Sequence, residues 1–169
     1  MKNIVLIGIM GAGKTTIGKK LSIDLNRPFI DMDEYLEKKY EMRISDMFKI
    51  SEDYFRDHES ACCKDMSTQS QTIISTGGGV IKRPENIAYL KKNGIIFYID
   101  RPLDQIVSDV DTSSRPLLKD GAQKLYDLDR ERRALYMQSC DYHLINARSE
   151  TKRLITLSII SSLIYRFSF

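Results

Sequence analysis

Short apolar runs and amphipathic stretches alternate along the whole chain. Five runs are rich in Ile, Phe or Tyr and are bounded by turn or polar residues, a pattern typical of buried strands. These expected strands are residues 4–7, 28–31, 71–75, 95–100 and 142–145. Because helical patterns lie between them, the alternation predicts a parallel sheet that is covered by helices on both faces.

The stretches between the strands carry apolar residues at helical spacing. Residues 14–25, for example, place Ile17 and Leu21 on one face. Pro84 opens another helix that we expect to end at Lys92. The other expected helices are residues 33–40, 51–66, 102–109, 121–140 and 150–164.

Composition narrows the class of protein. The length of 169 residues suggests one domain, 1–169, with a sizeable core, and we find no internal repeat. The net charge of +3 is only mildly basic, so no polyanion-binding surface is indicated. Cys62, Cys63 and Cys140 form an odd set without C-x-x-C spacing, which argues against a disulfide scaffold or a zinc site and favours the cytoplasm. Residues 154–169 are apolar but too short and too interrupted for a membrane anchor, and no signal peptide is expected.

A glycine-rich motif follows the first expected strand directly. Residues 8–15 read G-I-M-G-A-G-K-T and match the phosphate-binding loop in its required context of strand, loop and helix. Glycines let the backbone aim several N–H groups at one point, and the helix dipole adds positive charge there. Lys14 supplies an ammonium for the outer phosphates, and Thr15 supplies a hydroxyl for Mg²⁺. The candidate nucleotide-binding residues are Gly11, Ala12, Gly13, Lys14, Thr15 and Thr16.

Two further motifs bring charged side chains to the middle of the chain. Asp31 and Asp33 follow the second strand, where one can serve Mg²⁺ through water and the other can hold or deprotonate a hydroxyl. The same aspartates can instead cap the helix that follows them. Arg56 and Glu59 are three apart on an expected helix, so they form either a preorganised carboxylate-binding arginine or a surface ion pair.

The third strand and the long charged helix carry two more candidate groups. Residues 76–79 read T-G-G-G, which allows a ligand to approach the backbone closely or forms a flexible turn. Arg132 and Arg133 are candidate ligand contacts, although arginines on a charged helix are usually solvated. Residues 109–121 show little regular pattern, and a loop of this length in a compact domain is usually functional or disordered. Because it carries Arg115, we interpret this segment as a lid that brings a cation to a transferring phosphate.

Taken together, these motifs resemble the shikimate kinase family of small P-loop kinases, in order and spacing over nearly the whole chain. The resemblance implies a three-layer α/β/α sandwich with a five-stranded parallel sheet, a substrate-binding segment at about 31–62 and a mobile lid at about 109–121. It rests on G-x-x-G-x-G-K-T at 8–15, D-x-D at 31–33, F-R-x-x-E at 55–59, T-G-G-G at 76–79, R-P-L-L at 115–118 and R-x-x-x-Y at 132–136.

The family also implies roles for individual residues. Asp31 resembles the carboxylate that reaches Mg²⁺ through water, and Asp33 resembles the residue that binds the shikimate hydroxyls and serves as the base. At a normal carboxylate pKa near 4, Asp33 would be a weak base, and its larger contribution to catalysis would be to position the hydroxyl. The remaining residues resemble the substrate-carboxylate clamp (Arg56 and Arg132), a backbone contact (Gly78), the lid arginine (Arg115) and a weak candidate for the adenine (Arg148).

The resemblance implies a cytoplasmic monomer that uses ATP and Mg²⁺ to phosphorylate the 3-hydroxyl of shikimate, with neither nucleic acid nor membrane as a partner. Two positions depart from the family pattern: residues 108–111 lack a second lid arginine, and Ala134 replaces a usual proline. A rival interpretation is another small P-loop kinase that acts on gluconate or a nucleoside monophosphate. A GTPase switch is disfavoured because no N-K-x-D occurs and no D-x-x-G follows the third strand. A non-catalytic relative is also disfavoured, because the essential side chains are all present.

Overall fold

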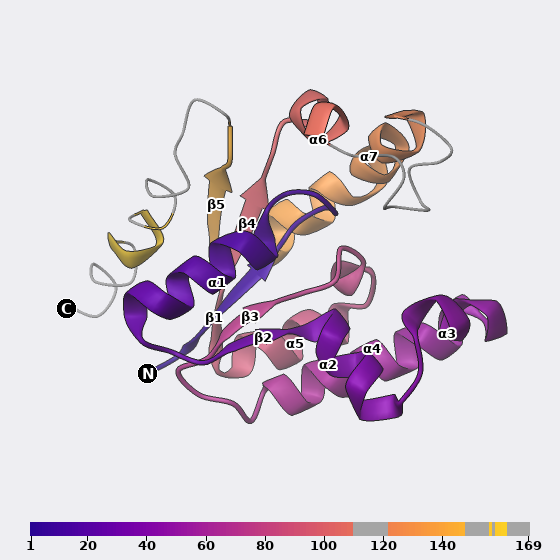
Figure 1. Ribbon diagram of the computed structural model, residues 1–169, viewed down its shortest axis with the longest axis horizontal. Helices are drawn as coiled ribbons and strands as arrows, with labels where there is room; N and C mark the ends of the chain where they lie inside the picture. Colours follow the sequence, from indigo (N-terminus) through magenta and orange to yellow (C-terminus); the bar gives the residue numbers. More distant parts are fainter. Residues whose placement is uncertain (110–121, 148–155, 157, 162–169) are drawn as a thin grey trace.

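The protein is described by a computed structural model that covers residues 1–109, 122–147, 156 and 158–161. Its centre is a five-stranded sheet in the order β2-β3-β1-β4-β5, and all four strand pairings are parallel (Figure 1). The strands are β1 (Asn3–Ile7), β2 (Phe29–Asp31), β3 (Ile73–Ser75), β4 (Gly94–Asp100) and β5 (Tyr142–Ile145). The five-stranded parallel sheet predicted from the sequence is therefore confirmed.

Helices cover both faces of this sheet. In Figure 1, α1 crosses in front of the sheet, whereas α5 and α7 lie behind it. The described elements are α1 (Lys14–Leu25), α2 (Met32–Tyr40), α3 (Ile44–Ile50), α4 (Glu52–Met66), the 3₁₀ turn η1 (Val80–Lys82), α5 (Pro84–Lys92), α6 (Leu103–Asp109) and α7 (Ala122–Ser139). Of the expected last helix, residues 156 and 158–161 are described as helical, and Ile159 is fully buried.

Helix α3 was not predicted from the sequence. It has seven residues, and its N-cap residue, Arg43, makes no capping side-chain bond. Instead, the Ile44 N–H donates to the Glu37 side chain over 2.8 Å, from seven residues earlier on α2. Glu41 ends α2 in a left-handed conformation with φ 50°. The start of α3 therefore depends on a non-local cap that short-range sequence patterns do not reveal.

The core lies between the sheet and its helices. Every residue of β1 is buried, as expected for the central strand of a parallel sheet. Cys62 and Cys63 are buried free thiols on α4, and Cys140 is a half-buried free thiol. No helix in the described part of the chain is long and apolar enough to cross a membrane. The loops that follow β1, β2 and β3 leave the sheet at the same edge, which brings three of the sequence motifs together.

Candidate active site

The loop after β1 curls around the N-terminus of α1. Gly8 and Gly13 have φ angles of 145° and 99°, which residues with a side chain rarely adopt. A Cβ at Gly8 would lie 2.5 Å from the Ile99 carbonyl oxygen, so this position also has no room for a side chain. Lys14 Nζ donates to the carbonyl oxygens of Gly8 and Ile9 over 2.7 and 3.0 Å. A helix N-terminus and an ammonium thus meet at one loop, an arrangement that binds phosphate.

Two side chains from distant elements hold this loop in place. Asn146 Nδ2 donates to the Ala12 carbonyl oxygen over 2.7 Å, and Arg101 Nη1 donates to that of Gly11 over 3.2 Å. Thr16 is exposed in the first turn of α1. These two contacts were not predicted from the sequence, because no local motif links Arg101 and Asn146 to partners 90 and 134 positions earlier.

Thr15 and Asp31 meet beside the loop. Thr15 Oγ1 donates to Asp31 Oδ2 over 2.8 Å, and the Ser75 hydroxyl lies 3.3 Å from the Thr15 hydroxyl. Hydroxyl and carboxylate oxygens are the ligands that Mg²⁺ prefers, so these residues fit a magnesium ion. No group of three or more His, Cys, Asp or Glu suited to a metal occurs among the described residues. A magnesium ion at this point therefore needs further oxygens, such as those of phosphates and water.

Asp31 and Asp33 perform different tasks at the start of α2. Asp31 is the N-cap, because its Oδ1 accepts the Asp33 N–H over 3.1 Å. Asp33 lines the pocket. Its side chain is open to solvent there, yet the protein packed around it excludes enough water to raise its pKa to about 6, with the Asp31 charge adding to the effect. The expected carboxylate pKa near 4 is therefore wrong, since desolvation makes Asp33 a stronger base than the sequence indicated.

Arg56 and Glu59 form a buried pair on one face of α4. Arg56 Nη1 donates to Glu59 Oε2 over 2.6 Å, and the two side chains are only 9% and 4% exposed. The alternative of a surface ion pair is therefore excluded. Arg56 Nε and Nη2 also donate to Glu52 Oε1, each over 3.3 Å. A Cβ at Gly79 would overlap the Arg56 guanidinium, which explains why a glycine stands beside this arginine.

Arg132 and Tyr136 bring α7 to the loop after β3. Arg132 Nη1 lies 3.4 Å from the Gly78 carbonyl oxygen, and the Tyr136 hydroxyl donates to the same oxygen. Arg132 is 9% exposed, and its buried Nε has no hydrogen-bond partner among the described residues. The same Nε lies 3.8 Å from Glu131 Oε1, too far for a hydrogen bond. A buried guanidinium whose donors are not all hydrogen-bonded is an expected feature of an arginine that binds an anionic ligand.

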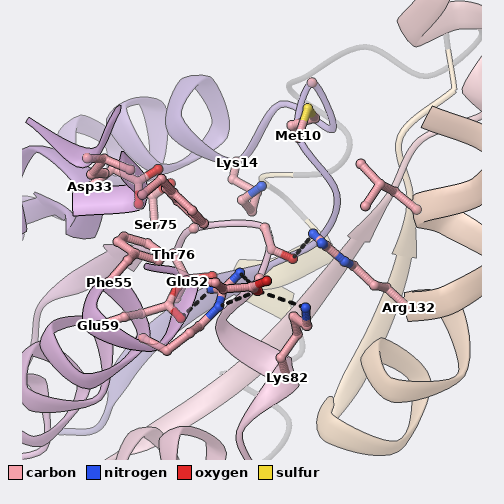
Figure 2. A pocket seen from close by; sticks show the side chains of 18 of the residues that line it. Met10, Lys14, Asp33, Glu52, Phe55, Glu59, Ser75, Thr76, Lys82 and Arg132 are labelled. Carbon is pink, nitrogen blue, oxygen red and sulfur yellow. Dashed lines mark hydrogen bonds and ion pairs between the residues drawn. The ribbon is translucent and has the colours of Figure 1, made fainter. Parts of the chain in front are cut away.

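These motifs line one pocket of about 700 Å³ between the α3–α4 region and α7 (Figure 2). Lys14, Asp33 and Arg132 are seen around it in Figure 2, with Glu59 at its base. Of the residues singled out from the sequence, the structure places Gly11, Lys14, Thr15, Asp31, Asp33, Arg56, Gly78 and Arg132 in its lining. Arg115 and Arg148 lie outside the described residues, as does most of the expected lid at 109–121.

Several lining residues were not singled out by the sequence analysis, and three of them come from α3 and η1. Ile44 and Phe48 come from α3, and Phe48 stacks on Phe55 with ring centroids 4.5 Å apart. They give the pocket an apolar wall opposite its charged groups. Lys82, from η1, adds a further cation. Their positions depend on α3 and η1, and neither element has a sequence pattern strong enough to predict it.

Comparison with known proteins places the chain among small kinases. The family model described as Shikimate kinase matches residues 10–164. Shikimate kinases of Clostridium botulinum (strain Alaska E43) and Clostridium beijerinckii are 46% and 47% identical to the chain. These alignments cover 86% of the chain and 89% of the first relative, and 88% of the chain and 88% of the second.

Solved structures that resemble this fold include further shikimate kinases. A shikimate kinase from Acinetobacter baumannii in complex with shikimate has a TM-score of 0.90 at 31% identity, over 100% of this chain and 96% of that one. A shikimate kinase from Aquifex aeolicus has a TM-score of 0.78 at 32% identity, over 97% of both chains. A gluconokinase from Sinorhizobium meliloti, at 11% identity and a TM-score of 0.57 over 99% of this chain and 98% of that one, shares the fold alone.

Proposed function

This chain belongs to the shikimate kinase family, and we propose that its activity resides in the pocket between the α3–α4 region and α7. The enzyme transfers the γ-phosphoryl group of ATP to the 3-hydroxyl of shikimate, with Mg²⁺ as its cofactor. The products are shikimate 3-phosphate and ADP, on the pathway to chorismate and the aromatic amino acids. The residue assignments that follow are proposals on how this chain performs that reaction.

The observation that carries the assignment is the convergence of two buried arginines on one end of the pocket. Arg56 approaches Gly79, and Arg132 approaches Gly78, so both guanidinium groups lie at the glycine run after β3. Arg132 lines the pocket, and its guanidinium is the donor that we assign to the substrate carboxylate. We propose that Arg56 and Arg132 bind this carboxylate and that Gly78 contacts the substrate through its backbone.

The opposite end of the pocket suits the nucleotide. Lys14 binds the outer phosphates through its Nζ, which also donates to the carbonyl oxygens of Gly8 and Ile9. The backbone of Gly11, Ala12 and Gly13 and the side chains of Thr15 and Thr16 complete the phosphate contacts. Thr15 and Asp31 would hold Mg²⁺, Asp31 through water as the family resemblance implies, and the ion would supply positive charge that neutralises the phosphates.

Asp33 lies between the two ends and acts on the acceptor hydroxyl. It orients this hydroxyl and accepts its proton, and its raised pKa of about 6 suits a base that works near neutral pH. Arg115 would stabilise charge on the transferring phosphoryl group from the lid at 109–121, and Arg148 would contact the adenine; both roles rest on the family resemblance. Removal of water by a closing lid would favour transfer to shikimate over hydrolysis of ATP.

Shikimate is the partner that this pocket suits. We further propose that the enzyme works as a cytoplasmic monomer and that it binds neither nucleic acid nor a membrane. The mildly basic charge of +3 supports the latter, since a polyanion-binding surface needs a larger basic excess.

The proposal is tested by ADP release from the purified protein with ATP and Mg²⁺. We expect ADP release that depends on shikimate, and little release with gluconate or a nucleoside monophosphate as the acceptor. Phosphorylation of gluconate at a similar kcat/KM would contradict shikimate as the preferred acceptor. Binding of GTP as tightly as ATP would argue against a kinase that prefers adenine nucleotides.

A further inference from the structure

Lys82 places a third cation at the end of the pocket that holds the two arginines. It is the last residue of η1, the turn that directly follows the glycine run at 77–79. Its Nζ lies 2.8 Å from Glu52 Oε1 on α4 and 3.8 Å from Glu131 Oε1 on α7. Figure 2 shows Lys82 and Glu52 pointing toward one another, with Arg132 approaching from the other side. Lys82 therefore lies between the two helices that carry Arg56 and Arg132.

One oxygen of Glu52 accepts hydrogen bonds from both Lys82 and Arg56. Lys82 Nζ donates to Glu52 Oε1 over 2.8 Å, and Arg56 Nε and Nη2 donate to the same atom over 3.3 Å. The donors of the two cations thus converge on a single carboxylate oxygen. Several cationic donors that converge on one point form a site that suits a carboxylate ligand. In this structure, the carboxylate of Glu52 occupies that site.

The pairing of Lys82 with Glu52 is weaker than that of Arg56 with Glu59. Glu52 and Glu131 are each 52% exposed and Lys82 is 31% exposed, whereas Arg56 and Glu59 are below 10%. Water screens exposed ion pairs, so they contribute little to stability and exchange partners readily. Glu52 can therefore be replaced by another carboxylate at small cost, while Glu59 keeps Arg56 in place.

We propose that Lys82 binds the carboxylate of the substrate together with Arg56 and Arg132, and that Glu52 occupies this position when the substrate is absent. This inference rests on the proposed function, because it assumes that the acceptor carries a carboxylate at this end of the pocket. When the substrate binds, its carboxylate replaces the Glu52 oxygen, so neither cation loses its acceptor. Lys82 is then a specificity-determining residue that favours an anionic acceptor over a neutral one.

The first test is the shikimate KM of Lys82→Met. We expect KM to rise about tenfold, the effect of losing one charge-assisted hydrogen bond, while kcat and the ATP KM change less than twofold. Lys82→Arg should recover most of the affinity, because it restores the charge. Glu52→Gln should lower the shikimate KM, since the competing carboxylate is lost. Lys39→Met is the matched control: Lys39 is 33% exposed, pairs with Asp65 and is not in the pocket lining.

The methyl ester of shikimate separates binding of the carboxylate from a structural role. The ester lacks the negative charge, so Lys82→Met should raise its KM less than twofold. Equal rises in KM for shikimate and its ester would mean that Lys82 only maintains the pocket, and would overturn the inference. An unchanged shikimate KM in Lys82→Met, with an active wild-type enzyme, would overturn the inference alone. A wild-type protein that releases no ADP with shikimate would overturn the proposed function and the inference with it.

Discussion

Arg132 and Arg133 are neighbours in the chain but have different partners. Arg132 lines the pocket beside Gly78, whereas Arg133 makes two hydrogen bonds to Asp100 at the end of β4, over 2.8 and 3.0 Å. Arg133 Nε also donates to Asp129 over 2.9 Å. The pocket therefore contains one of the two arginines, and the other anchors α7 to the sheet. Our first prediction uses this difference.

Arg132→Gln should raise the shikimate KM between about 10-fold and 100-fold, because a charged donor to the substrate carboxylate is lost. Arg133→Gln should change this KM less than threefold but lower the free energy of unfolding by about 1 kcal/mol, since it removes a two-bond ion pair. Steady-state kinetics and urea denaturation of both variants provide the comparison. A larger KM effect in Arg133→Gln than in Arg132→Gln would show that the roles are reversed.

The second prediction concerns the pH dependence of Asp33. Desolvation, together with the Asp31 charge, raises the pKa of Asp33 to about 6, and its ionised form is the base. We therefore expect kcat/KM to fall below about pH 6 with one proton bound. Asp33→Asn should lose most of kcat, and its pH profile should show no fall in kcat/KM near pH 6. If kcat/KM of the wild-type enzyme fell only near pH 4, this result would contradict the raised pKa of Asp33.

The same pKa shift has a consequence for stability. Asp33 holds its proton more tightly in the folded protein, at about 6, than in the unfolded chain, at about 3.8. Its protonation thus stabilises the fold below the unfolded pKa, and this contribution is lost as the pH rises through 6. Asp33→Asn, which stays neutral, should therefore be at least as stable as the wild type at pH 8. Thermal denaturation at pH 5 and pH 8 checks the sign.

The third prediction concerns Gly79. A Cβ at this position would overlap the Arg56 guanidinium, and the buried pair with Glu59 leaves Arg56 little freedom to move away. Gly79→Ala should therefore raise the shikimate KM about tenfold or more, while the ATP KM stays within twofold. Shikimate titration by calorimetry measures the affinity directly. An unchanged affinity would mean that Arg56 does not bind the substrate in the position described.

The fourth prediction follows from the family resemblance of Arg115, which lies outside the described residues. Arg115→Ala should lower kcat on the order of 10³-fold, the cost of losing a cation that stabilises the transferring phosphoryl group. The affinity for shikimate should stay within a few-fold. Arg130→Ala provides the control, because Arg130 is 81% exposed on α7. An unchanged kcat in Arg115→Ala would refute the lid assignment.

The regular elements could be predicted from the sequence because their signals are local. The ends of α1, α5 and β5 agree with the expected ranges, since turn residues and helix-starting positions mark them. β3 begins at Ile73, two residues later than expected, because Gln71 has a left-handed conformation with φ 57° and so cannot belong to the extended strand. Helix α3 depends on the Glu37 cap and could not be found from local spacing.

The site residues also fall into those that local motifs identify and those whose roles depend on tertiary packing. The phosphate-binding loop, Asp33 and Arg56 belong to motifs of fixed spacing, so the sequence identified them. The choice between Arg132 and Arg133 depends on Asp100, more than 30 residues away, and becomes clear only when α7 packs against β4. The pKa of Asp33 depends on how much protein surrounds it, which spacing does not encode. Lys82 is one lysine among many in the sequence until η1 turns it into the pocket.

The burial of Cys62 and Cys63 has a practical consequence for spectroscopic labelling. Desolvation raises the pKa of Cys62 to about 11 and that of Cys63 further, so neither forms the reactive thiolate at neutral pH. Cys140 is the more accessible thiol and does not line the pocket. A maleimide dye should therefore attach mainly to Cys140, and the native enzyme can carry a fluorophore there without cysteine substitutions or interference with substrate binding.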